Sequence, residues 1–368
     1  MSPLYLAAKH RLRWVRQKIS PPEVAIIGSY HGGNTGDMAL AGAIQLALKD
    51  TSTKYGLQSH YNLGVWPKAP RAIIGGGAIA DESFLRNLAE RYRGQWKRVA
   101  ILGVGFVGDI QKPDILQFLR EISVFSVRTH DAKQKFESMT GQTIANCAYD
   151  LSFAHFEENA YRNTSNNHEL PIGINLAEVQ CSLLNKSVQI ESEFVEASSD
   201  AHRRQGERIF QQYRTYFRAI VAHWLAQGKK VTHIPFTVGD DTIARHILEG
   251  MDVTYLKFQN KPAKVLARIR NVQRFYTTRF HALAFGIMCG VPVTPYCYAA
   301  KCRNLLLNLD IKNEIFLSPE RFIDNPIEPL ITKAICENGL IVPAKQLTQI
   351  KTSVHNLISS AYNRIQDA

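Results

Sequence analysis

Three apolar runs that each lead into glycine constrain the fold of this chain more than any other feature. The first is Val24-Ala25-Ile26-Ile27-Gly28, and the others run from Arg71 to Gly77 and from Arg98 to Gly105. Continuous apolar runs of this length are typical of parallel strands buried on both faces. Helical segments separate the runs, among them Met38 to Leu48 with Asp37 near its N-cap. This order predicts β-α-β units and a parallel sheet.

The same alternation restarts in the second half of the chain. Strands are predicted at 171–176, 230–236 and 274–277, and residues 208–227 have the apolar spacing of a long amphipathic helix. Between the two halves, residues 157–169 are polar and rich in asparagine, which is typical of a linker.

A chain of 368 residues is too long for one compact core. We therefore expect an α/β fold of two Rossmann-like domains, residues 21–156 and 170–340, which face one another across a cleft. The segment 341–368 has helical spacing and is expected to form a C-terminal helix that docks on an existing core.

Positive charge is concentrated at the N-terminus. The formal net charge is +12, from 44 Lys and Arg against 32 Asp and Glu. Residues 1–20, the N-terminal arm, contain Lys9, Arg11, Arg13, Arg16 and Lys18 and no acid. Leucine, tryptophan and valine alternate with these cations, so two interpretations stay open: the arm lies on an anionic bilayer, or it is an ordinary solvated or core-docked segment.

Other patterns exclude several protein classes. The six cysteines are scattered, without a C-x-x-C pair or zinc-finger spacing, so we expect reduced thiols and no metal. The N-terminus lacks the apolar segment and cleavage site of a secretory signal. The uncharged stretch 280–300 is interrupted at Gly290-Val291-Pro292, which leaves about ten helical residues where a membrane span needs about twenty. We expect a cytoplasmic protein, peripheral to the membrane if the arm binds lipid.

Two common ligand classes are not expected. Gly103-x-Gly105-x-x-Gly108 matches the dinucleotide pattern, but Pro113 at a helix N1 position places the helix too late to hold a pyrophosphate. We therefore expect no nicotinamide or flavin cofactor. Outside the arm, basic and aromatic residues do not interleave and no nucleic-acid module is recognisable, so nucleic acid is not an expected partner.

Two loops carry candidate chemistry. The segment Ser29 to Asp37 has three glycines between a strand and a helix, and Gly75-Gly76-Gly77 is expected as a turn at the same sheet edge. Such loops present backbone N–H groups to anions, and a tight strand–helix connection that needs positive φ angles is the alternative explanation for the glycines. Arg279 and His281 stand where a strand gives way to an apolar helix. Arginine there suits a carboxylate or phosphate, whereas a histidine alone is more often a core residue.

In their order and spacing these motifs resemble the polysaccharide pyruvyl transferase family, over roughly residues 23–312. The motifs are Tyr30-x-Gly-Gly-Asn34-x-Gly36-Asp37, Gly75-Gly76-Gly77, Val127-Arg128 with Asp131, Asp150-Leu-Ser-Phe153, Arg279-Phe280-His281-Ala282 with Val291-Pro292, and Tyr298-x-x-Lys301. The sequence departs from the family at Phe280, where an aliphatic residue is more usual, and in the two residues that separate Arg128 from Asp131.

The resemblance implies a fold similar to the GT-B glycosyltransferases, with the site between the domains. It also implies transfer of a pyruvyl group from phosphoenolpyruvate to a sugar, as a ketal, with release of phosphate. The acceptors of the family are units of exopolysaccharide or other cell-envelope polysaccharides, often lipid-linked. No cofactor or metal is implied.

The resemblance also assigns site residues. It places phosphoenolpyruvate against Arg128, Arg279, His281 and Lys301, with His281 as the catalytic acid and base and His31 as a second candidate. By analogy with GT-B enzymes, the sugar is expected on the N-terminal domain. The residues expected on that side are Tyr30, His31, Gly33, Asn34, Gly36, Asp37, Gly76 and Gly77. Two alternatives stay open: a nucleotide-sugar glycosyltransferase on the same fold, and a non-catalytic saccharide-binding member of the family.

Overall fold

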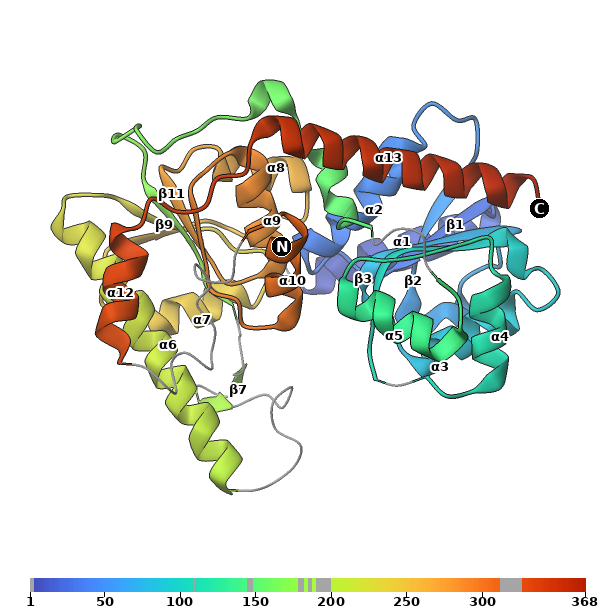
Figure 1. Cartoon of the computed structure of the whole chain (residues 1–368), viewed down its shortest axis with the longest axis horizontal. Coiled ribbons are helices and arrows are strands. Elements are labelled where there is room, and N and C mark those ends of the chain that lie inside the picture. Colours follow the sequence, from blue (N-terminus) through green and yellow to red (C-terminus); the bar gives the residue numbers. More distant parts are fainter. Residues whose placement is uncertain are drawn as a thin grey trace. The chain divides into compact units, whose positions relative to one another are not determined.

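A computed structural model of the chain describes residues 3–108, 110–143, 148–177, 182–184, 187–189, 200–311 and 326–368. The chain divides into two compact units (Figure 1): unit 1 is Met1–Phe156 with Lys345–Ala368, and unit 2 is Glu157–Ala344. Each unit contains a five-stranded sheet in which all pairs are parallel. The predicted α/β class with two parallel sheets is therefore confirmed.

The strands of unit 1 lie in the order β2-β1-β3-β4-β5. They are β1 (Val24–Gly28), β2 (Tyr55–Ser59), β3 (Arg71–Ala80), β4 (Val99–Phe106) and β5 (Val124–Val127). The α-helices of the unit are α1 (Pro3–Ile19), α2 (Thr35–Ala47), α3 (Glu82–Arg91), α4 (Pro113–Glu121), α5 (His130–Thr140) and α13 (Ala344–Gln366). Short 3₁₀ helices are η1 (His60–Val65), η2 (Trp96–Arg98) and η3 (Leu151–His155).

Both faces of the first sheet are covered, which explains its apolar strands. Helices α3, α4 and α5 pack on one face around Phe84, Leu88 and Phe118 (Figure 1). Helix α2 packs on the other face, where Leu40 and Ile44 lie against β3. Every residue of β1 is buried, as expected for a strand with helices on both sides.

The predicted Gly75-Gly76-Gly77 turn is wrong, because the three residues lie inside β3 and pair with β4. Gly76 and Gly77 have φ values of 68° and 86°, which glycine adopts without strain. A Cβ at Gly76 would lie 2.7 Å from Leu40 Cδ1 of α2. Glycine here lets a helix pack directly on the strand, and the strand continues through it.

Helix starts in unit 1 follow local capping chemistry. Helix α2 begins at Thr35 with Asn34 as its N-cap, because Asn34 Oδ1 accepts a hydrogen bond from Gly36 N at 2.8 Å. The helix thus starts before Asp37, the residue expected near its N-cap. Helix α4 begins at Pro113 in the N1 position, as predicted. Gly103 and Gly105 lie inside β4, so they do not open a helix as dinucleotide-binding glycines do.

The strands of unit 2 lie in the order β10-β9-β6-β11-β12. They are β6 (Ile172–Asn175), β9 (Val231–His233), β10 (Val253–Tyr255), β11 (Arg274–Thr277) and β12 (Val293–Pro295), and β7 (Ser182–Leu184) pairs separately with β8 (Ser187–Gln189). The helices are η4 (Glu158–Ala160), α6 (Asp200–Ala226), α7 (Asp240–Ile247), α8 (Pro262–Ile269), α9 (Phe280–Cys289), α10 (Ala300–Asn308) and α12 (Ile327–Cys336).

Counted along its own chain, unit 2 has the strand order 3-2-1-4-5 and unit 1 the order 2-1-3-4-5. Both are doubly wound orders, in which the chain leaves the first strand toward one edge of the sheet and later returns to build toward the other. The reversal lies between β1 and β3 in unit 1 and between β6 and β11 in unit 2. Ligands of doubly wound folds bind at the carboxyl ends of the strands at this point.

Two terminal segments have defined partners within unit 1. Helix α1 is linked to the edge strand β2 by Gln17, whose Nε2 donates to Leu57 O at 2.9 Å. Helix α13 buries Leu347, Ile350 and Val354. Lys351 Nζ of α13 also donates to Phe156 O at 2.8 Å. No helix in the described part of the chain combines the length and the apolar character needed to cross a membrane.

The segment expected as a linker, 157–169, contacts unit 2 along its length. Thr164 Oγ1 donates to Gln273 O at 3.0 Å, Tyr161 OH donates to Val342 O at 2.7 Å, and Arg162 N donates to Cys289 O at 3.2 Å. Cys289 ends α9, and Gly290 follows in the left-handed region at φ 75°. The helix thus stops at the residue where the sequence predicted its end.

Candidate functional site

The carboxyl ends of β6 and β11 carry a connected cluster of polar side chains. Because Thr277 pairs with Asn175 in register, the residues that follow β11 emerge beside Asn175. Asn175 Oδ1 accepts a hydrogen bond from Arg279 N at 3.1 Å, and Thr278 Oγ1 donates to Asn175 O at 2.5 Å. The hydroxyl oxygen of Tyr213, in α6, lies 3.2 Å from Thr278 Oγ1. The backbone at Arg279 is thereby held at the sheet edge.

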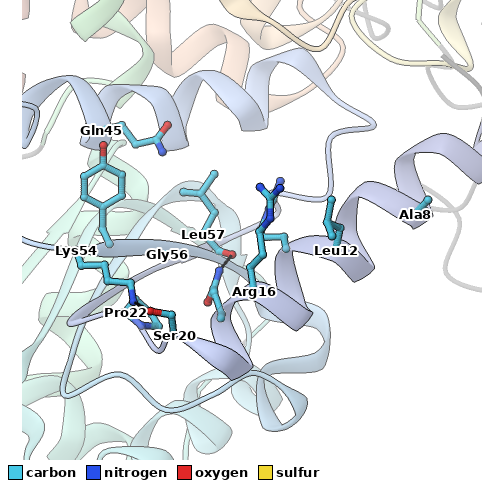
Figure 2. Close-up of a pocket in the computed structure, with 12 residues that line it drawn as sticks. Ala8, Leu12, Arg16, Ser20, Pro22, Gln45, Lys54, Gly56 and Leu57 are labelled. Atoms are coloured by element: carbon cyan, nitrogen blue, oxygen red, sulfur yellow. Dashed lines mark hydrogen bonds between the residues drawn. The ribbon is translucent and has the colours of Figure 1, made fainter.

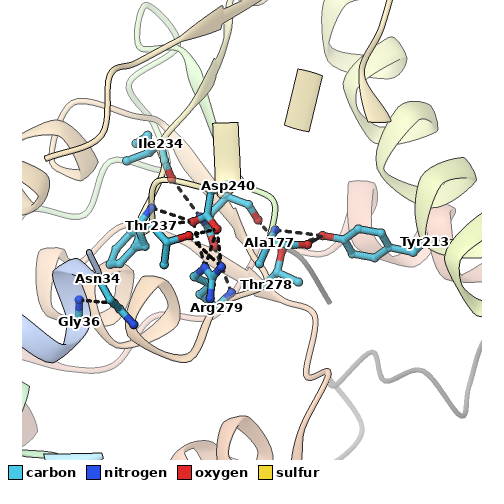
Figure 3. Close-up of polar contacts among 11 residues, drawn as sticks. Asn34, Gly36, Ala177, Tyr213, Ile234, Thr237, Asp240, Thr278 and Arg279 are labelled. Atoms are coloured by element: carbon cyan, nitrogen blue, oxygen red, sulfur yellow. Dashed lines mark hydrogen bonds and ion pairs between the residues drawn. The ribbon is translucent and has the colours of Figure 1, made fainter. Parts of the chain in front are cut away.

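Arg279 forms an ion pair with Asp240, which lies in the first turn of α7 (Figure 3). Arg279 Nε is 2.7 Å from Asp240 Oδ1 and 2.9 Å from Oδ2, and Arg279 Nη2 is 2.5 Å from Oδ1. Arg279 Nη2 also donates to Thr237 Oγ1 at 3.0 Å. The Asp240 side chain is fully buried, whereas that of Arg279 remains 21% exposed. One side of the guanidinium is thus fixed while part of it faces solvent.

Protein donors surround the Asp240 carboxylate. Phe236 N and Thr237 N donate to Oδ2 at 2.8 and 3.1 Å, and Thr237 Oγ1 donates to Oδ1 at 2.7 Å. Burial alone raises the pKa of Asp240, but the charge and hydrogen bonds of Arg279, with those of Phe236 and Thr237, outweigh it and hold this pKa below its ordinary value. The pair therefore stays ionised at neutral pH.

His281 and Lys301 follow Arg279 at the starts of two helices. Arg279 is the N-cap of α9, and His281 is the second residue of that helix. His281 is buried, with an exposed fraction of 9%, and its ring meets Phe280 edge-on at 5.0 Å between centroids. Lys301 is the second residue of α10, and its Nζ lies 5.1 Å from the centre of the Tyr298 ring. The structure brings Arg279, His281 and Lys301 into unit 2.

Arg128, the fourth residue predicted to bind phosphoenolpyruvate, belongs to unit 1. It follows β5, and its Nη1 lies 3.4 Å from Asp150 Oδ2. Both side chains are buried, at 6% and 1% exposed. Asp150 also caps η3 by accepting from Ser152 N at 3.0 Å. The family motif residues Arg128 and Asp150, 22 positions apart, are thus partners.

The glycine loop of unit 1 is built around Tyr30. Tyr30 is fully buried, and its hydroxyl donates to Gly75 O at 2.5 Å. A Cβ at Gly28 would lie 2.5 Å from the ring, so glycine makes room for it. Burial, reinforced by the charges of Asp37 and Asp150, raises the pKa of Tyr30, and the phenol remains a donor. Tyr30 therefore joins the loop to β3.

The other predicted loop residues have separate positions. His31 is exposed, and a Cβ at Gly33 would lie 3.3 Å from its ring. Asn34 Oδ1 accepts a hydrogen bond from Gly36 N in the cap of α2 (Figure 3), and Asp37 lies in the first turn of that helix. Gly76 and Gly77 lie in β3.

Two aromatic residues beside this loop were not predicted from the sequence. His60 begins η1 at the carboxyl end of β2, and its Nδ1 lies 3.4 Å from Ser29 Oγ. Tyr61 is 68% exposed, with its ring centre 3.9 Å from that of His60 and 6.1 Å from that of His31. Partial desolvation by the surrounding protein lowers the pKa of both His31 and His60. The missed signal is the pair His60-Tyr61, which follows Leu57 and the short strand β2 directly.

Asp240 and Asn175 were missed as well. Each follows or ends a strand that the sequence predicts, so their polar side chains at the carboxyl edge were the available signal.

Within the described residues, no group of three or more histidine, cysteine, aspartate and glutamate side chains is arranged to hold a metal ion.

Several solved structures resemble this chain at low identity. UDP-forming alpha,alpha-trehalose-phosphate synthase from Burkholderia vietnamiensis is 10% identical, with a TM-score of 0.44 over 94% of this chain and 100% of that one. UDP-GlcNAc 2-epimerase from Methanocaldococcus jannaschii is 10% identical, with a TM-score of 0.45 over 89% and 98%. A trehalose-6-phosphate synthase is 9% identical, with a TM-score of 0.47 over 94% and 99%. No curated protein matches the chain.

The family comparison covers most of the chain. The family model for polysaccharide pyruvyl transferase matches residues 34–298. Arg128, Arg279 and His281 lie within the match, whereas Tyr30 precedes it and Lys301 follows it. Since the matched segment is well over half of the 368 residues, this chain belongs to the polysaccharide pyruvyl transferase family.

Proposed function

We propose that this chain transfers a pyruvyl group from phosphoenolpyruvate to a sugar unit of a polysaccharide or its lipid-linked precursor, and that it releases phosphate. One observation carries the proposal: in a member of this family, buried Asp240 holds Arg279 two positions before His281, at the start of α9. A fixed guanidinium and an imidazole at a sheet edge suit a small anionic substrate that also needs proton transfer.

The donor carries a carboxylate and a phosphate, so its site needs several cations. Arg279 presents the exposed part of its guanidinium, and the N-terminus of α9 adds a partial positive charge beside it. Lys301 adds a point charge from α10. Arg128, which pairs with buried Asp150 in unit 1, stays a prediction of the family resemblance. In this assignment the cations bind the donor and stabilise the phosphate as it leaves.

The chemistry requires two additions at one carbon. A proton goes to C3 of phosphoenolpyruvate, and a sugar oxygen bonds to C2 as its own proton is removed. A second sugar hydroxyl then bonds to C2, the C2–O bond to phosphate breaks, and the hydroxyl proton leaves with the phosphate. The product is a methyl-bearing pyruvate ketal. We assign the proton transfers to His281, because imidazole exchanges protons near neutral pH.

We place the sugar at the carboxyl edge of unit 1. Exposed Tyr61 offers an aromatic face of the kind on which sugar C–H groups pack, and His31 and His60 flank it. Because partial desolvation lowers the pKa of both histidines, they are neutral near pH 7 and can accept hydrogen bonds from hydroxyl groups. His31 remains the second candidate for a proton acceptor.

Phosphate release from phosphoenolpyruvate in the presence of sugar acceptors tests the function. His281→Ala is expected to lower kcat by at least about 100-fold, whereas His223→Ala on α6, which contacts Gln227, is expected to keep parent activity. Tyr61→Ala is expected to raise KM for the sugar and leave KM for phosphoenolpyruvate unchanged. Turnover of nucleotide sugars without use of phosphoenolpyruvate would show a glycosyltransferase instead. Parent-like turnover by His281→Ala would remove its assigned role.

A further inference from the structure

Unit 1 contains a cavity of about 740 Å³ that the pyruvyl transfer chemistry does not use (Figure 2). It lies between α1, α2 and the edge strand β2. Its lining is contributed by Ala8, Leu12, Arg13, Arg16, Gln17, Ser20, Pro22, Gln45, Lys54, Tyr55, Gly56 and Leu57. The volume falls in the range of small-molecule sites, roughly 300 to 1,000 Å³.

The charge of the lining is one-sided. It includes the cations Arg13, Arg16 and Lys54, and no aspartate or glutamate among the described residues that form it. Arg13 Nη1 donates to Tyr30 O at 2.8 Å, and Lys54 Nζ donates to Ser20 Oγ. Within the described part of the chain, the Arg16 guanidinium has no hydrogen bond or ion pair. Three cations without a carboxylate favour a multiply charged anion.

The walls are held in place without a ligand. Gln17 Nε2 donates to Leu57 O at 2.9 Å, and Gln17 Oε1 accepts from Gln58 Nε2 at 3.0 Å. A Cβ at Gly56 would lie 2.7 Å from Gln17 Cδ, so glycine lets α1 approach the strand closely. These contacts fasten α1 to the sheet edge and fix the spacing between its cations and Lys54.

The helix that forms one wall also exposes apolar side chains. Leu12 is 51% exposed, and on the same helix Val15 is 36% and Ile19 is 80% exposed. Arg11 and Lys18 are exposed beside them. A helix with exposed leucine, valine and isoleucine among basic residues is typical of a segment that lies at a membrane surface. Leu12 of the cavity wall therefore belongs to a helix whose exposed side chains are both apolar and basic.

We propose that this cavity binds the phosphomonoester headgroup of an anionic membrane lipid. Arg13, Arg16 and Lys54 hold the phosphate, and Leu12 and Leu57 contact the apolar part next to it. The site is separate from the residues assigned to pyruvyl transfer and stands without that function, because its test contains neither phosphoenolpyruvate nor sugar.

Vesicle binding at 150 mM salt tests the proposal. The full chain is mixed with phosphatidylcholine vesicles that carry phosphatidic acid, or phosphatidylserine at matched surface charge. We expect tighter binding to phosphatidic acid. Arg16→Gln is expected to weaken binding to phosphatidic acid roughly tenfold or more, beyond the roughly fivefold loss that one surface charge costs on either lipid.

Arg11→Gln is the matched control, because it removes one charge from the same exposed helix outside the cavity. Arg11→Gln is expected to weaken binding to both kinds of vesicle by the same factor, roughly fivefold. Equal losses from Arg11→Gln and Arg16→Gln, or equal binding of the parent to both lipids, would overturn the proposal and leave a general electrostatic attraction. Protection against thermal unfolding by inorganic phosphate alone, at concentrations where the vesicles bind, would overturn it in favour of a free phosphate ligand.

Discussion

Asp240 is the residue on which the unit 2 site depends. It contacts no solvent, and its partners include Arg279, Thr237 and two backbone amides. A buried carboxylate is tolerated only when such partners replace water, and loss of one member leaves the others unsatisfied. Asp240 therefore both stabilises unit 2 and sets the direction of the Arg279 guanidinium.

We expect Asp240→Asn to lower the free energy of unfolding by about 3 kcal/mol at pH 7, because it leaves the partly buried Arg279 charge without its counterion. Its neighbour Asp241 provides a matched control: Asp241 pairs with Arg245 at 2.9 Å, but both side chains are exposed. Asp241→Asn is expected to cost less than about 1 kcal/mol. Urea unfolding of both variants checks this, and equal losses would contradict the buried pair.

His233, at the end of β9, makes stability depend on pH. It is fully buried, and burial lowers its pKa to about 4 from an ordinary 6.5. Between those pH values only the unfolded state takes up the proton, so stability falls as the pH drops from 6.5 to 4 and is unaffected above 6.5. The total loss is of order 3 kcal/mol.

We expect His233→Phe to reduce the loss of stability between pH 6.5 and 4, because phenylalanine keeps an aromatic ring at this position and cannot take up a proton. The measurement is the melting temperature between pH 4 and pH 7. The exposed His130 serves as the control, and His130→Phe should retain the slope of the parent. If His233→Phe loses stability between pH 6.5 and 4 as steeply as the parent, the histidine is not its source.

At the scale of elements, glycine decides how helices meet strands. In β3, Gly76 leaves the space that Leu40 of α2 occupies. In β2, Gly56 leaves the space that Gln17 of α1 occupies, so this helix can approach the strand closely. The sequence predicts β3 from its apolar run and does not predict β2, and it does not say whether a glycine ends a strand or lets a helix pack against it. The Gly75-Gly76-Gly77 segment was therefore misread as a turn.

Helix α13 is the element that ties the end of the chain to unit 1. Arg71 Nε of β3 donates to Ile365 O at 2.9 Å, and Thr53 and Tyr362 are hydrogen-bonded through their hydroxyls. Ile358 is fully buried on the apolar face of the helix. The core of unit 1 is thus completed by residues more than 200 positions away from its own strands.

We expect Ile358→Ala to lower the free energy of unfolding by about 2 to 5 kcal/mol, because it leaves a cavity in that core. Ser353→Ala on the exposed face of the same helix is the control, with an expected change within about 0.5 kcal/mol. Urea unfolding measures both. A change below 1 kcal/mol for Ile358→Ala would mean that α13 contributes little to the stability of unit 1.

At the scale of the whole molecule, much of the excess positive charge lies away from the candidate catalytic residues. Five of the cations that produce the net charge of +12 belong to α1, where three structural features meet: a basic helix, exposed apolar side chains and a cavity. Arg279 and His281 lie instead after β11, next to the reversal of strand order in unit 2, and His31 lies after β1, next to the reversal in unit 1. Net charge thus reports on the N-terminal helix more than on the candidate catalytic residues.

The sequence by itself determined what is local. Apolar runs specified β1, β3 and β4, Pro113 and Gly290 specified where helices start and stop, and the motif placed Arg279 and His281 at the start of a helix. Only the tertiary structure decided which residues meet: Asp240 with Arg279 across 39 positions, and Tyr362 with Thr53 across 309. The physical reason is that periodicity records which face of a segment is buried, whereas strand order and helix docking decide what buries it.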